Sequence, residues 1–374
     1  MSRIAVLGSG AWGTAIALAL HRRGGHQITL WSYSAAEAGQ IAASGENSLF
    51  LPGFPIPKEI AVTSNAEAIG EAEIVISVIP SEFLRPTLAR LRSRFHSGQI
   101  VVSATKGVEN NSFLRMTEVI ASSLGANSEQ AIVRGANPDV HLEVFSEDTA
   151  PEVSSSGLAP APRFLDDFTI PIGAFSGPSF ALEVAQGQPT AVTVAFDDPA
   201  IAARIQQEFS SETLRLYTST DVIGVELGGA LKNVIAIAAG VAAGMGLGHN
   251  SAAALMTRGI AEITRLAVAC GGRRETLAGL SGVGDLVLTC TGSLSRNRTV
   301  GHALGEGRSL PEILESLGGK VAEGVLTTRA ALGLARRHNI EMPITEQMEL
   351  ILDEGKDPRE AIKDLMLRPG KHEH

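Results

Sequence analysis

The stretch Arg3–Gly13, RIAVLGSGAWG, decides the fold of the first half of the chain. Residues 3–7 form a short apolar run, as in a buried strand, and GSGAWG follows directly at residues 8–13. A helical pattern then covers residues 14–23. A G-x-G-x-x-G turn between a strand and a helix is fairly specific for dinucleotide binding. The sequence therefore predicts a Rossmann-type turn that binds NAD or NADP.

Each glycine of this turn has its own expected role. Gly8 permits the tight turn, Gly10 lets the backbone approach a pyrophosphate, and Gly13 lets the helix close on the strand. The helix N-terminus adds backbone N–H groups and a favourable dipole for the phosphates. The alternative is that the glycines only form a turn.

The end of the second expected strand, residues 27–31, leaves the choice between NAD and NADP open. An NAD-selective site usually has Asp or Glu there to bind the adenosine ribose, and an NADP-selective site has an arginine nearby. This chain instead has Ser32, Tyr33 and Ser34, and its first carboxylate is that of Glu37.

Strands and helices continue to alternate up to about residue 218. Continuous apolar runs at 74–79 and 100–104 are typical of buried parallel strands, whose carboxyl ends collect ligands. Lys106 follows the second run closely, so we expect it at a site rather than on an ordinary surface. Further strands are expected at 172–175, 190–196 and 214–217. The pattern predicts a doubly wound α/β domain over residues 1–218.

Residues 134–169 interrupt this alternation. They contain four prolines, several serines and a cluster of acidic residues, without a regular period. A loop of this length inside a compact domain is usually functional or disordered. We predict a flexible insertion.

After Asp221 the sequence predicts only helices, and we expect an all-helical substrate and catalytic domain over residues 219–374. Glycines recur at multiples of four residues, which places them on one helix face where another helix or the cofactor packs closely. They are Gly224, Gly228, Gly240, Gly244 and Gly248. The uncharged run 234–247 is too short to span a bilayer and is expected to be a buried helix. A second helix is expected at 250–270, with a solvated face that carries Arg258, Glu262 and Arg265 and has no catalytic role.

The stretch Glu226–Ile237, ELGGALKNVIAI, is small and apolar except for its polar interruption by Lys232 and Asn233. A lysine in such surroundings either reaches to water or lies at the wall of a site. In a site, desolvation makes its ammonium easier to deprotonate, and such lysines act as proton donors and acceptors. Both interpretations remain open for the segment alone.

A second polar motif lies in the helical half. A glycine-rich turn at 279–284 leads into Asp285, and SLSRNR follows at 293–298, where two arginines and an asparagine lie in a serine-rich loop. Arginine makes bidentate contacts to phosphate, so we predict a binding site for a small phosphate. The alternative is a solvated or nucleic-acid-binding basic turn.

Composition excludes several classes of protein. Hydrophobic residues make up 44% of the 374 residues, which is typical of a globular protein. The net charge of −9 argues against general nucleic-acid binding. Only Cys270 and Cys290 are present, with no metal-ligand spacing, which indicates a reducing compartment and no metal site. The N-terminus lacks the pattern of a signal peptide, so we expect a cytoplasmic protein without a membrane span.

Ten motifs, in chain order, resemble those of the bacterial NAD(P)-dependent glycerol-3-phosphate dehydrogenases. They are GSGAWGTA, LWSYS, FLPGFPIP, VSATKGVE, FSGPSFALE, IGVELGGALKNVIAI, TRGIAEI, GVGDLVLTCTGSLSRNR, VAEGV and EMPIT. The resemblance covers nearly the whole chain. It implies reversible reduction of dihydroxyacetone phosphate to sn-glycerol 3-phosphate for phospholipid synthesis. It also implies a Rossmann domain followed by an all-helical domain, and a homodimer.

The resemblance also implies roles for individual residues. Lys232 matches the catalytic lysine, the proton donor or acceptor at substrate C2. The residues implied to bind substrate are Lys106, Gly177, Ser179, Asp285, Ser295, Arg296 and Asn297, and we add Lys232 and Asn233. Those implied to contact the cofactor are Trp12, Tyr33, Lys106, Ala181, Arg296, Val321 and Glu323. Arg296 and Asn297 are expected to hold the phosphate, while Asp285 and Asn233 orient Lys232 or the substrate hydroxyls.

Two departures from the family pattern are visible. Ala11 stands where the family commonly has Ser, and it is expected to keep the backbone cradle while losing one side-chain contact to the cofactor. The family has no counterpart to the insertion at 134–169. Two alternative functions remain: a dehydrogenase of the same architecture that acts on a 3-hydroxy acid, and a non-catalytic NAD(P)-binding sensor.

Overall fold

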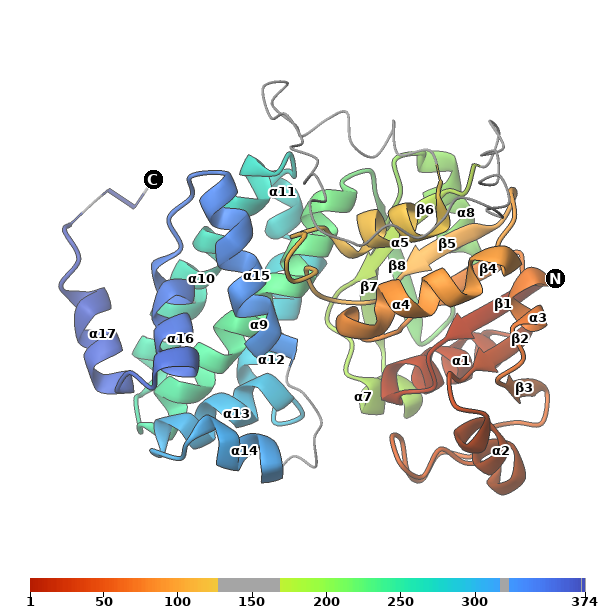
Figure 1. Ribbon diagram of the computed structural model, residues 1–374, viewed down its shortest axis with the longest axis horizontal. Coiled ribbons are helices and arrows are strands. Elements are labelled where there is room, and N and C mark those ends of the chain that lie inside the picture. The colour runs from red at the N-terminus through yellow and green to blue at the C-terminus, as the bar shows by residue number, and fades with distance from the viewer. Residues whose placement is uncertain (127–168, 317–322, 371, 374) are drawn as a thin grey trace, which may run out of the picture.

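A computed structural model describes the chain except for residues 127–168, 317–322, 371 and 374. The predicted insertion at 134–169 therefore lies, apart from Thr169, outside the described residues. Two halves lie side by side in Figure 1, one built around a sheet and one built of helices. The strands are β1 (Ser2–Leu7), β2 (His26–Trp31), β3 (Ile60–Thr63), β4 (Ile74–Ser77), β5 (Ile100–Ser103), β6 (Ile172–Ser176), β7 (Thr190–Ala195) and β8 (Leu214–Ser219).

The helices of the sheet half connect these strands. They are α1 (Ala11–Arg23), α2 (Ala35–Ser44), α3 (Glu67–Gly70), α4 (Ser81–Leu91), η1 (Arg92–Arg94), α5 (Met116–Leu124), α7 (Ala181–Ala185) and α8 (Pro199–Phe209). The helical half contains α9 (Val222–Gly244), α10 (His249–Ala269), α11 (Arg274–Leu277), η2 (Leu280–Gly284), α12 (Asp285–Thr291), α13 (Arg296–Gly305), α14 (Leu310–Ser316), α15 (Glu323–Arg337), α16 (Pro343–Glu354) and α17 (Pro358–Met366). The predicted fold class is confirmed.

The eight strands form one sheet in the order β3-β2-β1-β4-β5-β6-β7-β8. All neighbours are parallel except β6 and β7, which run antiparallel. The connection between those two strands carries only the five-residue α7, which is too short a helix to carry the chain back across the sheet. The chain therefore returns antiparallel at this point of an otherwise Rossmann-type sheet.

Both faces of the sheet are covered, which explains the continuous apolar runs. Successive side chains of a strand point to opposite faces, so Ile4 and Val6 join a core with α1 and α8, while Ala5 and Leu7 join one with α4 and α5. A parallel strand that is buried on both faces has no polar position in its centre.

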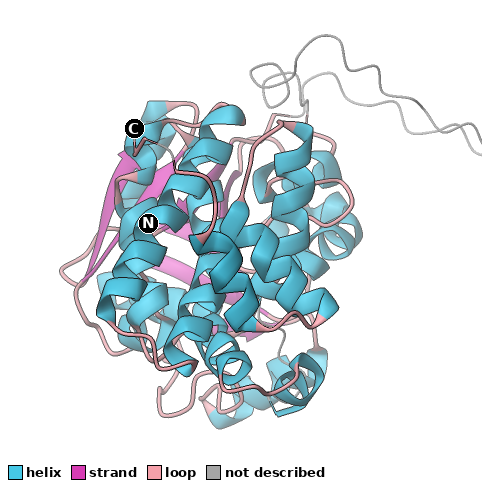
Figure 2. Cartoon of the chain, turned by 90° about the vertical axis from the view of Figure 1, so that its left-hand side faces the viewer, coloured by secondary structure: helices cyan, strands magenta, loops and turns pink. Residues whose placement is uncertain are grey.

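Helix α9 is the centre of the helical half. It is long and apolar enough to span a membrane by length and composition, but 94% of its most apolar window is buried inside the molecule. It packs against α10, α12, α13 and α15. Figure 2 shows the helical half in front of the strands, and the expected buried helix around residues 234–247 belongs to this longer core helix.

The glycines of α9 allow close packing, as predicted, with one exception. A Cβ atom on Gly240 would overlap the carbonyl oxygen of Arg298, and one on Gly301 would overlap that of Ile237. Helices α9 and α13 therefore pack backbone against backbone. Gly248 is not part of this face, because α9 ends at Gly244 and Gly248 is the N-cap of α10.

Glu262 does not lie on a solvated face, so that prediction was wrong. Its side chain is buried on α10 and accepts hydrogen bonds from the backbone of Ile344, at 2.7 Å, and of Thr345, at 3.3 Å. These are N–H groups in the first turn of α16, whose N-cap residue Met342 forms no side-chain cap bond. Glu262 thus caps a helix from 82 residues away in sequence, which a helical period cannot indicate.

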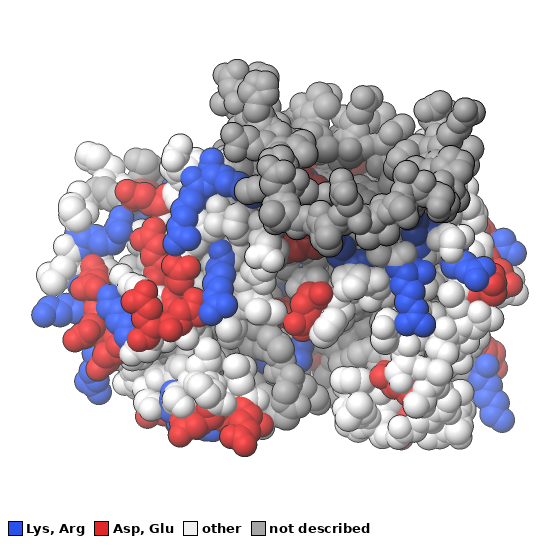
Figure 3. Space-filling model, viewed as in Figure 1, with Lys and Arg blue, Asp and Glu red and all other residues white. Residues whose placement is uncertain are grey.

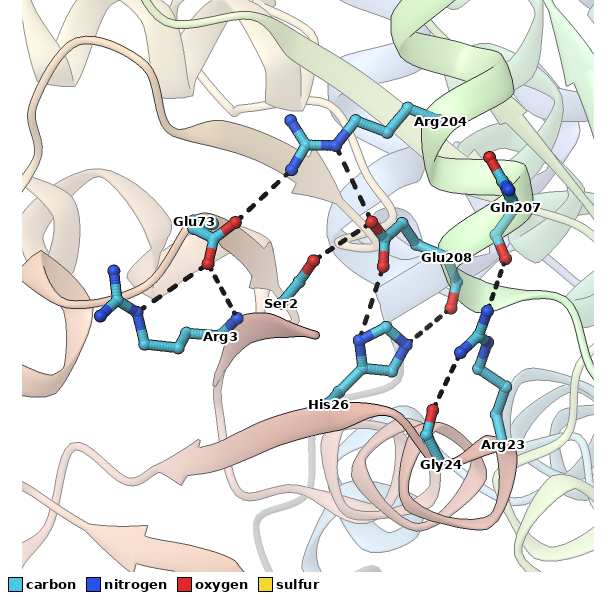
Figure 4. A network of polar contacts seen from close by, with 9 residues as sticks. All are labelled: Ser2, Arg3, Arg23, Gly24, His26, Glu73, Arg204, Gln207 and Glu208. Carbon is cyan, nitrogen blue, oxygen red and sulfur yellow. Dashed lines mark hydrogen bonds and ion pairs between the residues drawn. The ribbon is translucent and has the colours of Figure 1, made fainter.

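A polar network closes the amino-terminal edge of the sheet (Figure 4). Glu208 of α8 accepts a hydrogen bond from Ser2 at 3.1 Å, and its carbonyl oxygen lies 2.9 Å from the ring of His26. Arg204 lies 3.6 Å from Glu73, the residue that directly precedes β4 in sequence. These contacts tie α8 to β1 and β2 at the edge opposite the carboxyl ends of these strands.

Candidate active site

The predicted site residues gather where the two halves meet. The surface is hollowed between the sheet half and the helical half, and charged side chains of both signs are visible there (Figure 3). Lys106 comes from the loop after β5 and Asp285 from the start of α12. The site is therefore built from both halves, at the carboxyl edge of the sheet, where ligands of such sheets bind.

The glycine turn fits a dinucleotide. Gly8 has φ +119°, and a Cβ there would lie 3.0 Å from the carbonyl oxygen of Val78. A Cβ on Gly13 would overlap the carbonyl oxygen of Gly8, so α1 can approach β1 only with glycine there. Gly10, the N-cap of α1, has open space around it and no side-chain cap. The N-terminus of α1 therefore presents uncapped N–H groups to a pyrophosphate.

The side chains of Asn47 and Glu37, which were not predicted to support the turn, hold it in place. Buried Asn47 donates to the Ser9 carbonyl at 2.6 Å and to the Thr14 hydroxyl at 2.9 Å. The Ser9 hydroxyl donates to the carboxylate of Glu37. Asn47 lies 33 residues beyond Thr14, in a segment without a regular period, so no local pattern indicates its contact with the turn.

Lys232 lies buried on α9, and its ammonium contacts the carboxylate of Asp285 and the hydroxyl of Thr289, the latter at 2.7 Å. The ammonium of Lys106 lies 2.8 Å from the other oxygen of Asp285. Two lysines thus share one fully buried carboxylate. The alternative interpretation of Lys232 as a surface lysine that reaches to water is wrong, because the side chain is buried.

The two lysines differ in their pKa. Burial lowers the pKa of Lys232 to about 7, and the neighbouring charge of Lys106 acts in the same direction, against the attraction of Asp285. For Lys106, burial disfavours the ammonium, but the charge and hydrogen bond of Asp285, together with the charge of Glu323, raise its pKa. Burial thus lowers the pKa of Lys232 toward neutrality, whereas the contact with Asp285 holds the pKa of Lys106 above its ordinary value.

The SLSRNR motif is not a loop throughout, because α13 begins at Arg296. Ser295 is the N-cap and its hydroxyl accepts from the Arg298 backbone at 3.2 Å. Arg296, in the first turn, is exposed and forms no ion pair among the described residues. An arginine at a helix N-terminus whose guanidinium has no ion-pair partner among the described residues is suited to bind a phosphate group. The turn at 279–284 is likewise helical, since η2 covers Leu280–Gly284.

A second contact set links α9, α13 and the start of α15. The side-chain amide of Asn233 donates to Glu323 at 3.4 Å, and the side-chain oxygen of Asn297 accepts from the Gly324 backbone at 3.0 Å. Asn297 is buried, so it contributes to holding α15 in place. The structure thus brings Asn233, Asn297 and Glu323 together.

The remaining predicted residues lie along the carboxyl edge of the sheet. Gly177 and Ser179 follow β6, where the Ser179 hydroxyl donates to the Gly177 carbonyl at 2.9 Å, and Ala181 begins α7. Trp12 packs on Phe175 with ring centroids 6.3 Å apart. Tyr33 lies just beyond β2, with its ring exposed. Ala11 begins α1, and Val321 lies outside the described residues.

Thr289 is a site residue that sequence reasoning missed. It lies four residues after Asp285 on α12, so both side chains face Lys232 from one side of the helix. Its hydroxyl also donates to the Asp285 carbonyl at 2.6 Å, which fixes its orientation. The sequence signal that could have identified Thr289 is its spacing of four residues from Asp285 in a largely apolar run.

A dinucleotide turn beside a buried lysine–carboxylate centre defines the class of the protein, an NAD(P)-dependent dehydrogenase of the Rossmann type with a helical second half. The family model described as the NAD-dependent glycerol-3-phosphate dehydrogenase N-terminus matches residues 3–155 and 162–202, and the model of its C-terminus matches residues 221–363. The chain belongs to this family.

Individual relatives agree with the family models. A protein of Acidobacterium capsulatum named glycerol-3-phosphate dehydrogenase [NAD(P)+] is 54% identical and covered over 100% of both chains. One of Koribacter versatilis with the same name is 51% identical over 100% of this chain and 99% of its own. A crystal structure of glycerol-3-phosphate dehydrogenase from Coxiella burnetii superposes with a TM-score of 0.83 at 35% identity, over 98% of this chain and 99% of that one. These matches favour the predicted enzyme over a 3-hydroxy-acid dehydrogenase or a sensor.

Proposed function

We propose that Lys232 is the proton donor and acceptor at C2 when this NAD(P)-dependent oxidoreductase interconverts dihydroxyacetone phosphate and sn-glycerol 3-phosphate. The observation that carries the proposal is the buried position of Lys232, whose amine contacts Asp285 and Thr289. Burial lowers its pKa to about 7, although the charge of Asp285 acts in the opposite direction. A general acid–base group works best when its pKa lies near the working pH. The class of reaction follows from the family, and the role of Lys232 is our assignment.

The roles of the other residues follow from their chemistry. Asp285 and Thr289 hold the amine of Lys232 in one orientation, so its proton points to a fixed place in the site. Lys106, which keeps its charge, stabilises the negative charge that develops on the C2 oxygen during reduction. Arg296 and Asn297 hold the phosphate and fix C2 relative to Lys232, and we assign Ser295, the N-cap of α13, to the same substrate-binding turn.

The dinucleotide is held by the glycine turn and the N-terminus of α1. When bound, its nicotinamide supplies or accepts the hydride at C2. We assign Gly8, Gly10 and Gly13 to the pyrophosphate cradle. The further contacts that we propose for the cofactor come from Ala11, Trp12, Tyr33, Lys106, Ala181, Arg296, Val321 and Glu323.

We also propose the domain boundaries of the chain, its oligomeric state and its cellular location. Residues 1–218 form the NAD(P)-binding domain and residues 219–374 the helical catalytic domain, since the described strands all lie before residue 220. The chain acts as a cytoplasmic homodimer whose product supplies glycerophospholipid synthesis. The resemblance in the motifs supports this proposal, and a monomer mass in analytical ultracentrifugation at micromolar concentration would contradict the dimer.

Replacing Lys232 by Met tests the catalytic assignment. Methionine fills a similar volume without a proton to exchange, and Asp285 keeps its ion pair with Lys106, so the fold is expected to persist. General acid–base groups contribute about 10²- to 10⁴-fold, and we expect kcat for ketone reduction to fall by that range. The Kd for NADPH, measured by titration calorimetry, should change less than about threefold, because the pyrophosphate cradle is untouched.

The matched control is Lys356→Met. Lys356 is partly buried and donates a hydrogen bond to Gln347 at 2.8 Å, but it lies in the connection between α16 and α17. This variant should keep its turnover. A Lys232→Met enzyme with turnover within about threefold of the parent would remove Lys232 from the mechanism.

A further inference from the structure

The end of β2 carries no acidic side chain for the adenosine ribose. Ser32 is buried and Tyr33 is 62% exposed, directly after the strand. The first carboxylate, that of Glu37, accepts a hydrogen bond from Ser9 in the glycine turn and so is already engaged. In folds of this type the adenosine ribose lies beside the end of the second strand. Tyr33 therefore marks the place of the ribose 2′ position.

The structure brings an arginine to this place that the sequence order does not reveal. The guanidinium of Arg90, 57 residues later on α4, lies 5.1 Å from the centroid of the Tyr33 ring. Arg90 and the 54% exposed Phe83 are seven residues apart on α4, so they share one face of that helix. This face and the end of β2 thus form one surface beside the expected ribose.

Arg90 differs from Arg85 and Arg94 in having no carboxylate partner among the described residues. Arg85, on the same helix, contacts Glu109 at 2.8 Å, and Arg94 in η1 contacts Glu67 at 2.5 Å. Among the described residues Arg90 forms no ion pair, and the aromatic ring of Tyr33 is its charge-attracting contact. A guanidinium stacked on a ring is held in one plane, with its N–H groups left to bind an anion.

We propose that Arg90 binds the 2′-phosphate of NADPH and thereby selects NADPH over NADH. A guanidinium makes bidentate, charge-assisted hydrogen bonds to a phosphate, whereas the 2′-hydroxyl of NADH offers it no charge. Tyr33 acts as the platform that orients Arg90. The inference concerns the cofactor side of the site and does not depend on the role of Lys232.

The test compares both cofactors in the Arg90→Ala variant of the full chain. The parent enzyme should have the higher kcat/KM with NADPH. Because a hydrogen bond to a charged group contributes roughly 1.5–3 kcal/mol, the variant should lose about ten- to hundredfold in kcat/KM for NADPH. Its kcat/KM for NADH should change less than about twofold, since that cofactor lacks the group that Arg90 binds.

Two further measurements make the result specific. Arg94→Ala removes the same charge one turn farther along, together with an exposed ion pair, and should leave the ratio of the two cofactors unchanged. Adenosine 2′,5′-bisphosphate serves as a probe of the free site without turnover. Its dissociation constant, measured by titration calorimetry, should rise about tenfold or more in Arg90→Ala, while that of adenosine 5′-monophosphate should stay within about twofold.

Three outcomes would overturn the proposal. The first is a parent enzyme that prefers NADH by more than about tenfold. The second is an equal loss for both cofactors in Arg90→Ala, which would mean that Arg90 only supports Tyr33 against the adenine. The third is unchanged binding of adenosine 2′,5′-bisphosphate, whatever happens to turnover.

Discussion

At the scale of single residues, the site depends on one carboxylate that serves two lysines. Asp285 is fully buried and contacts both Lys106 and Lys232. A buried carboxylate needs a positive partner, and the raised pKa of Lys106 favours its charged form beside Asp285. In the proposed mechanism Lys232 can therefore lose its proton while Lys106 remains the partner of Asp285. In the proposed mechanism one lysine is the charge partner of Asp285 and the other exchanges the proton, which accounts for the presence of two lysines.

The pKa of Lys232 predicts opposite pH profiles for the two directions of the reaction. Lys232 changes from ammonium to amine as pH rises through about 7. Ketone reduction needs the ammonium and alcohol oxidation needs the amine, so kcat/KM for reduction should fall as pH rises through this range, and kcat/KM for oxidation should rise. Because kcat/KM reports groups of the free enzyme, initial rates at low substrate from pH 5.5 to 9 measure this pKa.

A second group with a similar pKa requires a control. Burial raises the pKa of Glu262 to about 7 against the hydrogen bonds from Ile344 and Thr345. A carboxyl group with a raised pKa in the folded state contributes stability below its unfolded pKa of 4.5, and loses it as pH rises through about 7. Glu262→Gln should therefore flatten the dependence of stability on pH in that range. It should leave the activity profile unchanged; a profile that moves with Glu262 would contradict the assignment to Lys232.

The role of a single residue could be predicted from sequence where its side-chain type and its immediate neighbours already indicate its chemistry. Lys232 interrupts an apolar helix, and Arg296 belongs to a phosphate-type motif and begins α13. Thr289, Asn47 and Arg90 act through partners that are distant in sequence or are hidden in ordinary patterns. Their roles depend on which elements become neighbours, and this information is absent from local spacing.

At the scale of elements, the contact between α9 and α13 sets the position of the turn at Arg296, to which we assign phosphate binding. Both helices carry glycine at the crossing, and Gly301 of α13 meets the carbonyl oxygen of Ile237 on α9. Arg296 and Lys232 are thereby held on adjacent helices. The glycine spacing on α9 predicted close packing, but it could not identify α13 as the partner or exclude Gly248, because a period does not indicate where a helix ends.

Gly301→Ala should destabilise this crossing. The added methyl group meets backbone, which cannot move aside as a flexible side chain can, and overpacking costs about 1–3 kcal/mol or more. The control is Gly39→Ala on exposed α2, where a Cβ has no atom within 4 Å and should add roughly 0.5–1 kcal/mol of helix stability. Urea unfolding of both variants, followed by circular dichroism, compares their midpoints. A Gly301→Ala midpoint equal to that of the parent would show that α13 moves easily.

At the scale of the whole molecule, a second buried carboxylate besides Asp285, that of Glu226, joins the two halves. Glu226 of α9 accepts hydrogen bonds from the Thr117 backbone at 2.8 Å and from its hydroxyl at 2.7 Å, and its carboxylate lies 2.6 Å from Arg115. Thr117 lies in the first turn of α5, so a residue of the helical half caps a helix of the sheet half. The sequence predicted two halves, but a cap supplied from 109 residues away has no local signature.

Glu226→Gln tests whether this joint positions the catalytic centre. Glu226 lies six residues before Lys232 on the same helix, so a shift of α9 against α5 moves Lys232 relative to the glycine turn. Removing the charge leaves Arg115 with only Glu118, at 2.7 Å, and breaking a buried ion pair costs up to about 3–5 kcal/mol, with glutamine retaining part of the hydrogen bonding. We expect a lower midpoint of thermal unfolding, and kcat at saturating substrates reduced at least about fivefold, because misplacement of reacting groups is costly.

The matched control for this variant is Glu208→Gln, another carboxylate with several partners, which lies at the opposite edge of the sheet and joins no element to the helical half. Its contacts are partly exposed, so its stability should fall by less than about 1 kcal/mol and its kcat should stay at the parent value. The comparison separates two meanings of the Glu226 contact. If Glu226→Gln loses stability but keeps its full kcat, the joint only holds the halves together. If kcat falls while Glu208→Gln is unaffected, the cap on α5 is part of what places Lys232 at the substrate.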